Sequence, residues 1–96
     1  LPQSPAEPAR WSYAGDSWES ALVHLLNELV FQLFTKNRAA QGLRCRLFPP
    51  FRVEWEGEWL AIPAEMLKLE IKSATYHQLQ LAPTQGGWRA AVYFDV

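Results

Sequence analysis

The sequence has one cysteine, one methionine and a formal net charge of −1, and each of these small values excludes a class of protein. One cysteine cannot form a disulfide within the chain, and a free thiol suits a reducing compartment. The balanced charge lacks the basic excess that is typical of nucleic-acid-binding domains. The apolar runs are too short to span a bilayer, and the N-terminus lacks the pattern of a signal peptide. We therefore expect a cytoplasmic protein that binds neither membranes nor a specific nucleic-acid sequence.

The sequence also lacks the motifs of common catalytic and metal sites. It has no glycine-rich phosphate loop, no paired cysteines at zinc spacing and no acidic calcium loop. No serine–histidine–acid set is recognisable either. Cys45 alternates with Leu43 and Leu47, a pattern that predicts a buried strand residue and not a nucleophile. The residues alone therefore offer no recognisable catalytic or metal-binding motif.

The chain has the organisation of one small domain. Its ninety-six residues allow a single unit, residues 1–96, with a modest core. Residues 1–10 contain three prolines and few apolar side chains, which predicts an extended or disordered lead-in. A short strand is predicted at residues 11–14. No internal repeat or linker divides the remainder.

A long helix is predicted at residues 17–36, with Asp16 as its N-cap and Glu19 completing a capping box. Its main apolar stripe recurs at helical spacing and consists of Trp18, Leu22, Leu25, Leu26, Leu29 and Leu33. A second apolar group lies largely off this stripe and consists of Val23, Val30, Phe31 and Phe34. So wide an apolar surface requires burial on more than one face, between a sheet and another helix or against a partner. We expect the second group to be covered by a second chain or a second protomer.

Three strands are predicted after the helix, at residues 43–48, 51–56 and 59–62, with a turn at Gly57. Residues 63–69 have the pattern of a turn or loop. Together with the terminal segment, these elements predict an α+β fold, in which one long helix packs on a mostly antiparallel sheet.

Residues 70–96 have the pattern of a terminal hairpin, in which two β-rich runs flank a turn that contains a glycine pair. Matching the apolar faces of the two runs sets Leu81 opposite Trp88. In that register Lys72 lies diagonal to Asp95 on the same face of the sheet, at a spacing that a long lysine can reach.

Two carboxylates end this hairpin, the side chain of Asp95 and the α-carboxylate of Val96. Adjacent carboxylates are unsuited to a core and can form a cation site. A cation held there would prefer oxygen ligands and would therefore be calcium, magnesium or manganese. Spacing alone favours another interpretation, in which Lys72 and Asp95 form an ordinary strand-end salt bridge of small energy.

Several segments, taken in order, resemble the archease family. The most specific are residues 70–77 (EIKSATYH), 86–89 (GGWR) and 94–96 (FDV), and residues 26–29 (LNEL) and 57–58 (GE) also fit. Archease is the small protein that activates RtcB, the GTP-dependent RNA ligase of tRNA splicing. The resemblance covers most of the chain.

The resemblance implies activation of a ligase and not catalysis. Archeases promote guanylylation of the active-site histidine of the ligase and so restore the ligase for repeated turnover. Asp95 and Val96 match the C-terminal metal ligands of the family, and Lys72 matches a lysine implicated in activation. The implied cofactor is a divalent cation with oxygen ligands, either calcium or magnesium or manganese. The implied partner is RtcB.

The chain departs from the family at its N-terminus. Family members begin with a strand that carries a His-Thr-Ala-Asp motif, followed by a first helix, and this sequence contains neither. The sequence opens on Leu1, and a translated Met-Leu start normally keeps its methionine, which indicates that Leu1 is not a natural start. We expect a processed, truncated or incompletely represented archease whose metal site is only partial.

Two other functions remain open on the residues alone. The chain can be an interaction module that uses an exposed sheet edge or the apolar helix face as a scaffold, with no role in ligation. It can also be a small metal-dependent enzyme, although it offers few candidate acid–base groups. Direct stimulation of ligase guanylylation is the assay that separates these functions from ligase activation.

Overall fold

The structure is a computed structural model that describes residues 6–68 and 70–96. The elements in these residues are β1 (Glu7–Ala14), α1 (Trp18–Thr35), β2 (Arg38–Phe48), β3 (Arg52–Ala61), the 3₁₀-helix η1 (Ala64–Met66), β4 (Ser73–Ala74), β5 (Gln80–Thr84), β6 (Gly87–Ala91) and β7 (Phe94–Asp95). All of the strand pairs among them are antiparallel, and the predicted α+β class is confirmed. Neither helix of the described residues has the length and apolarity that crossing a membrane requires.

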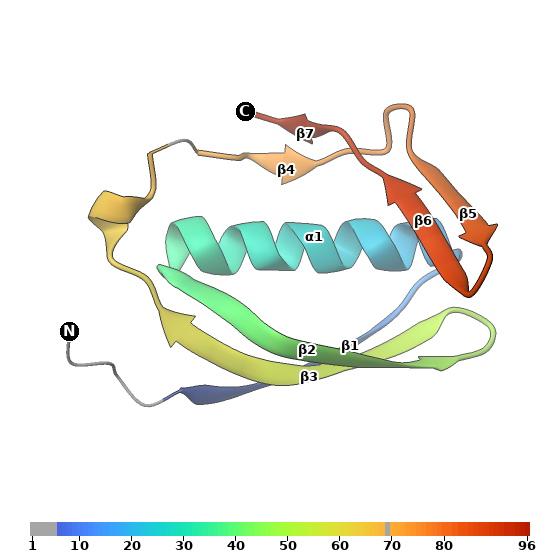
Figure 1. The fold of residues 1–96 in the computed structure, drawn as a ribbon, viewed down its shortest axis with the longest axis horizontal. Helices are drawn as coiled ribbons and strands as arrows, with labels where there is room; N and C mark the ends of the chain where they lie inside the picture. Colours follow the sequence, from blue (N-terminus) through green and yellow to red (C-terminus); the bar gives the residue numbers. More distant parts are fainter. Residues whose placement is uncertain (1–5, 69) are drawn as a thin grey trace.

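The long helix α1 lies between two layers of strands (Figure 1). One layer is a three-stranded sheet with the order β1-β3-β2, and the other is the short pair of β4 and β7. The remaining strands, β5 and β6, form a separate two-stranded hairpin. A helix that packs on two opposite sides needs apolar side chains around much of its circumference, which accounts for the wide apolar surface of α1.

The N-terminus of α1 is capped by Ser17, and the prediction that Asp16 is the N-cap is wrong. The hydroxyl of Ser17 accepts a hydrogen bond from the main-chain N–H of Ser20 at 2.9 Å, and the main-chain N–H of Ser17 donates to the hydroxyl of Ser20 at 3.3 Å. The two serines therefore form the capping box expected of Asp16 and Glu19. Both pairs have the same spacing of three residues, so the spacing in the sequence does not distinguish them.

The core lies between α1 and the three-stranded sheet. Its buried apolar side chains are Ala9, Ala21, Val23, Leu25, Val53 and Trp59. Trp11 continues this core across the sheet, because its ring lies 5.6 Å from that of Trp59 and 6.3 Å from that of Trp55, in stacked geometry. Aromatic stacking thus joins β1 to β3 in addition to their main-chain hydrogen bonds.

The second apolar group of α1 is covered at one end and exposed at the other. Val23 is buried by residues of this chain alone, so the expectation that it needs cover from outside is wrong. β4 packs against α1, and its Ala74 is only 5% exposed. Phe31 is 45% exposed, and Val30 and Phe34 are partly exposed. Cover by a second chain or protomer therefore stays a prediction only for the end of the group around Phe31.

β2 and β3 are longer than predicted, and Gly57 does not form a turn. β2 begins at Arg38, and β3 continues through Gly57 without a break. The register between the two strands shifts between Gln41 and Arg44, so that β2 bulges opposite Gly57. A Cβ atom on Gly57 would lie 2.8 Å from the carbonyl oxygen of Gln41. Glycine is therefore required here by the close approach of two strands.

β1 also begins earlier than predicted. Residues 7–10 were expected in an extended or disordered lead-in, but they belong to β1 and pair with β3 as far as Glu7 opposite Trp59. Ala9, inside this segment, is buried in the core. Residues 7–10 therefore form a strand, through pairing with β3 and burial of Ala9, although the segment contains a proline. Residues 1–5 of the expected lead-in lie outside the described residues.

Cys45 is exposed, and the prediction that it is buried is wrong. Its place in a strand was predicted correctly, since Cys45 pairs with Trp55 across β2 and β3. β2 is an edge strand, which has a neighbouring strand on one side only. Leu47, two residues further along β2, is exposed as well. Alternation in the sequence identified the strand but not its position at the edge of the sheet.

Replacing Val53 with alanine is expected to lower the free energy of unfolding by about 2 kcal/mol, because buried methyl groups are lost and a cavity remains. Val53 is 2% exposed, whereas Leu47, directly opposite it in the sheet, is 57% exposed. Leu47→Ala is therefore the matched control and should cost clearly less. Urea unfolding followed by tryptophan fluorescence measures both variants, and equal losses would contradict this placement of the core.

Candidate functional site

The C-terminal strand β7 pairs with β4 and brings the sequence-predicted site residues into one region. Ser73 lies opposite Asp95 in this pair, and Ala74 lies opposite Phe94. The main-chain N–H of Lys72 donates a hydrogen bond to the carbonyl oxygen of Asp95 at 2.8 Å. Main-chain contact, and not a side-chain ion pair, therefore holds Lys72 next to Asp95. We call Lys72, Asp95 and Val96 the C-terminal tip.

The predicted register of the terminal hairpin is wrong. Leu81 lies opposite Ala90, and Trp88 lies opposite Pro83, because Thr84 and Gly87 close a tight turn around Gly86. Gly86 has a φ of +87°, a conformation that glycine adopts at no steric cost.

The hairpin is also divided into two separate ladders, β4 with β7 and β5 with β6. The first strand turns between them, where the main-chain N–H of Leu79 donates to the carbonyl oxygen of Tyr76 at 3.1 Å and Gln78 has a φ of +50°. The returning strand passes from Ala91 to Phe94 with a much shorter connection. The predicted register assumed that side chains alternate between the two faces without a break along residues 70–96, and this assumption was wrong.

The predicted sharing of one sheet face by Lys72 and Asp95 depends on the hairpin register that is wrong. Asp95 lies opposite Ser73, and Lys72 precedes the first residue of β4, so the shared face stays a prediction. The ion pairs of the described residues include neither Lys72 nor Asp95, so the alternative of a strand-end salt bridge is not formed there. Both residues are exposed.

The C-terminal tip has suitable donor chemistry for a hard cation but too few donors. Carboxylate oxygens are the ligands that calcium and magnesium prefer, yet calcium takes roughly six to eight oxygens. The described residues contain no group of three or more histidine, cysteine, aspartate or glutamate side chains that can hold a metal ion. Asp95 and Val96 would therefore need further oxygen ligands, and their role as ligands stays a prediction.

Sequence reasoning missed Asn27, which connects α1 to the strand beside the C-terminal tip. The side-chain amide of Asn27 donates to the carbonyl oxygen of Ala74 at 3.3 Å, and its Oδ1 accepts from the main-chain N–H of Ala74 at 2.6 Å. Asparagine is unfavourable in a helix interior, because its side chain competes for main-chain hydrogen bonds. That mismatch, in a helix rich in leucine, is the signal that identifies Asn27 in retrospect.

A groove of about 310 Å³ lies beside β4 on α1. Its helix wall includes Val30, Phe31 and Phe34, and its other wall includes Ile71 and Lys72. The groove joins the exposed end of the second apolar group to the C-terminal tip. The sequence indicated that the second apolar group of α1 can bind a partner. The groove is the part of that group that remains accessible in this chain.

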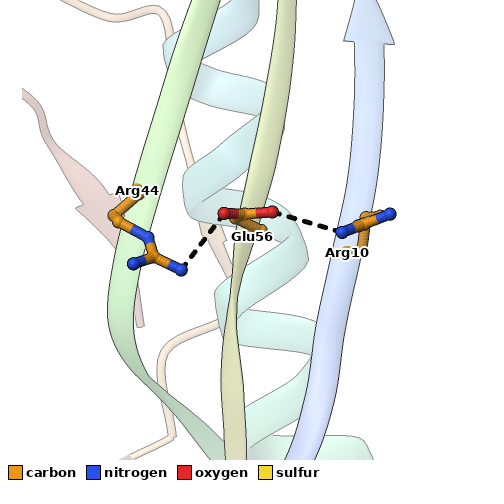
Figure 2. A network of polar contacts seen from close by, with 3 residues as sticks. All are labelled: Arg10, Arg44 and Glu56. Carbon is orange, nitrogen blue, oxygen red and sulfur yellow. Dashed lines mark hydrogen bonds and ion pairs between the residues drawn. The ribbon is translucent and has the colours of Figure 1, made fainter.

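The outer face of the three-stranded sheet carries a network of ion pairs (Figure 2). Glu56 on β3 contacts Arg10 on β1 at 3.3 Å and Arg44 on β2 at 3.1 Å, with one carboxylate oxygen for each arginine. A concavity of about 640 Å³ surrounds the three side chains. All three are substantially exposed, which is typical of a solvated sheet face and contributes little to stability.

Comparison with protein families gives one match, to the Archease protein family (MTH1598/TM1083), over residues 2–96. The chain belongs to the archease family. The comparisons with curated proteins and with solved structures found no match. Archease membership supports a general role as an activator of an RNA ligase that acts with a protein partner, and it is consistent with a non-catalytic role. The fold, with one helix and antiparallel strands, is consistent with that family.

Glu56→Gln is expected to lower the free energy of unfolding of this archease by less than about 1 kcal/mol, because its ion pairs are exposed. Glu58→Gln is the matched control, since Glu58 lies two residues further along β3 and makes no ion pair among the described residues. Urea unfolding at low and high salt measures both, and any difference should shrink at high salt. A loss of several kcal/mol in Glu56→Gln alone would instead assign the network a structural role.

Proposed function

We propose that this chain activates RtcB, the GTP-dependent RNA ligase of tRNA splicing, in the cytoplasm. Activation consists of promoting guanylylation of the ligase, so that the ligase completes multiple turnovers. Family membership over residues 2–96 supports the general role. The observation that carries the finer proposal is the hydrogen bond between Lys72 and Asp95, which gathers the implied activation residues at one exposed end of the β4–β7 pair.

In this proposal the C-terminal tip enters or borders the ligase pocket. Asp95 and the α-carboxylate of Val96 contribute oxygen ligands to a divalent cation, calcium or else magnesium or manganese, which would bring positive charge close to nucleotide phosphates. Since two carboxylates do not complete a coordination sphere, the remaining ligands come from outside the described residues. The exposure of both residues supports such shared coordination, because neither is enclosed by this chain.

Lys72 has a separate role in this proposal. An ammonium group is a compact point charge that binds phosphate or carboxylate groups. Lys72 is exposed and makes no ion pair with Asp95, so its charge is free to contact the ligase or its nucleotide.

A second candidate function is a protein-interaction scaffold with no role in ligation. The groove beside Phe31 favours it, because Val30, Phe31 and Phe34 line the groove together, and grouped accessible apolar side chains mark interaction surfaces. The two functions differ in their dependence on charge. A scaffold that uses the groove does not require the carboxylate of Asp95, whereas a cation-binding tip does.

Asp95→Asn is expected to abolish stimulation of ligase guanylylation and to leave the fold intact. Asparagine keeps the shape of aspartate but removes the charge that holds a hard cation. A C-terminal extension that displaces the Val96 carboxylate should have the same effect, and Lys72→Ala should weaken stimulation without unfolding the chain. The assay mixes the chain with ligase, GTP and divalent metal and measures covalent guanylylate.

Matched controls for this assay are Glu65→Gln and Lys68→Ala, which remove the same charges at exposed positions before β4. Both should stimulate the ligase as the unmutated chain does. Full stimulation by Asp95→Asn would refute the metal-binding tip. Absence of stimulation by the unmutated chain would refute the proposed function as a whole.

A further inference from the structure

We propose that Asn27 is a positioning residue for ligase activation, because it holds β4 on α1 and thereby orders the C-terminal tip before the ligase binds. This inference rests on the proposed function, in which Lys72 and Asp95 contact the ligase. Asn27 itself belongs to the middle of α1 and acts through the main chain of Ala74.

Asn27 satisfies both main-chain polar groups of Ala74. The 2.6 Å contact joins Oδ1 of Asn27 to the N–H of Ala74, and the 3.3 Å contact joins its Nδ2 to the carbonyl oxygen. A side-chain amide with this pair of bonds replaces the neighbouring strand that β4 lacks on that side. Ala74 is 5% exposed, and buried main-chain groups that lose their partners destabilise the folded chain. The amide of Asn27 is therefore the polar attachment of β4 to α1.

The other side of β4 is attached to β7. The N–H of Thr75 donates to the carbonyl oxygen of Tyr93 at 3.0 Å, and the N–H of Lys72 donates to that of Asp95 at 2.8 Å. β4 thus connects α1 on one side with the tip-bearing strand on the other. Each strand of this pair is only two residues long, and an isolated two-stranded pair is marginal at best in water. Its order therefore depends on the attachment to α1.

Loss of this attachment would lower the apparent affinity of the chain for the ligase. A tip that is disordered before binding must be ordered when the ligase binds, and the ordering entropy reduces apparent affinity. Once bound, the same Lys72 and Asp95 groups contact the ligase. Asn27→Ala should therefore raise the concentration of the chain needed for half-maximal stimulation by roughly ten-fold, the effect of about one or two lost hydrogen bonds. Maximal stimulation should stay close to that of the unmutated chain.

Amide hydrogen exchange measures the attachment without any ligase. In Asn27→Ala, exchange at Lys72, Ala74 and Thr75 should become at least roughly ten-fold faster, because local opening of β4 becomes easier. Amides within α1 and the three-stranded sheet should keep their protection. A general loss of stability would instead accelerate exchange in all of these elements together, so the pattern separates positioning from an ordinary structural role.

Gln32→Ala is the matched control, because Gln32 is the other amide side chain of α1 with defined partners. Its amide donates to Glu28 at 2.9 Å and its Oε1 accepts from Arg38 at 2.6 Å, and neither partner belongs to β4. This variant should leave exchange at Ala74 and the half-maximal concentration unchanged. If Asn27→Ala does not fold, Asn27→Asp serves in its place, since it keeps the acceptor for the Ala74 N–H and replaces the donor with a charged oxygen that cannot bond the Ala74 carbonyl.

The outcomes distinguish this inference from the proposed function. Unchanged exchange at Lys72, Ala74 and Thr75 in Asn27→Ala would overturn the inference and leave the proposed function intact. Faster exchange with an unaltered half-maximal concentration would also overturn it, because an ordered tip would then be unnecessary. If the unmutated chain fails to stimulate the ligase, the proposed function fails, while the exchange pattern still decides whether Asn27 holds β4.

Discussion

The attachment of β4 to α1 through Asn27 is the contact on which the second half of the structure depends. α1 is apolar around much of its circumference and so needs a layer of strands on each of two sides (Figure 1). The three-stranded sheet forms the first layer through a row of tryptophan rings. In the second layer, β4 and β7, only Ala74 is buried. Two hydrogen bonds between a side chain of α1 and the main chain of Ala74 attach this layer to the helix.

The two layers therefore differ in how firmly they are held. β1, β2 and β3 share long ladders of main-chain hydrogen bonds, whereas β4 and β7 share only two residue pairs. Regions with few buried contacts open more readily than the core, and surfaces that bind partners are often drawn from them. The groove beside Phe31 is the place where the second layer ends before the helix is covered. Partial cover and an accessible C-terminal tip thus have the same cause, a second layer that is too short for α1.

The sequence predicted those features that depend on local periodicity. The helix, the α+β class and the existence of a terminal hairpin were all evident from apolar spacing and glycine turns. The sequence did not predict the features that depend on the path of the chain in space. The turn from Tyr76 to Leu79 changes the register between the two ladders of the terminal hairpin. Gly57 has the sequence pattern of a turn, but it lies within β3 opposite a bulge in β2, where the two strands approach closely. The exposure of Cys45 depends on strand order, which alternation does not encode.

The absence of an ion pair between Lys72 and Asp95 also changes the chemistry expected at the C-terminal tip. In such a pair, Lys72 would neutralise Asp95 and compete with a cation for its carboxylate. Without it, Asp95 keeps its charge for a ligand, and Lys72 keeps its own for another. The described residues contain no group of three histidine, cysteine, aspartate or glutamate side chains at a metal spacing, and two carboxylates alone have little capacity to hold a cation. In the proposed function this incompleteness couples cation binding to ligase binding, since the nucleotide and the ligase supply further oxygen ligands to the cation.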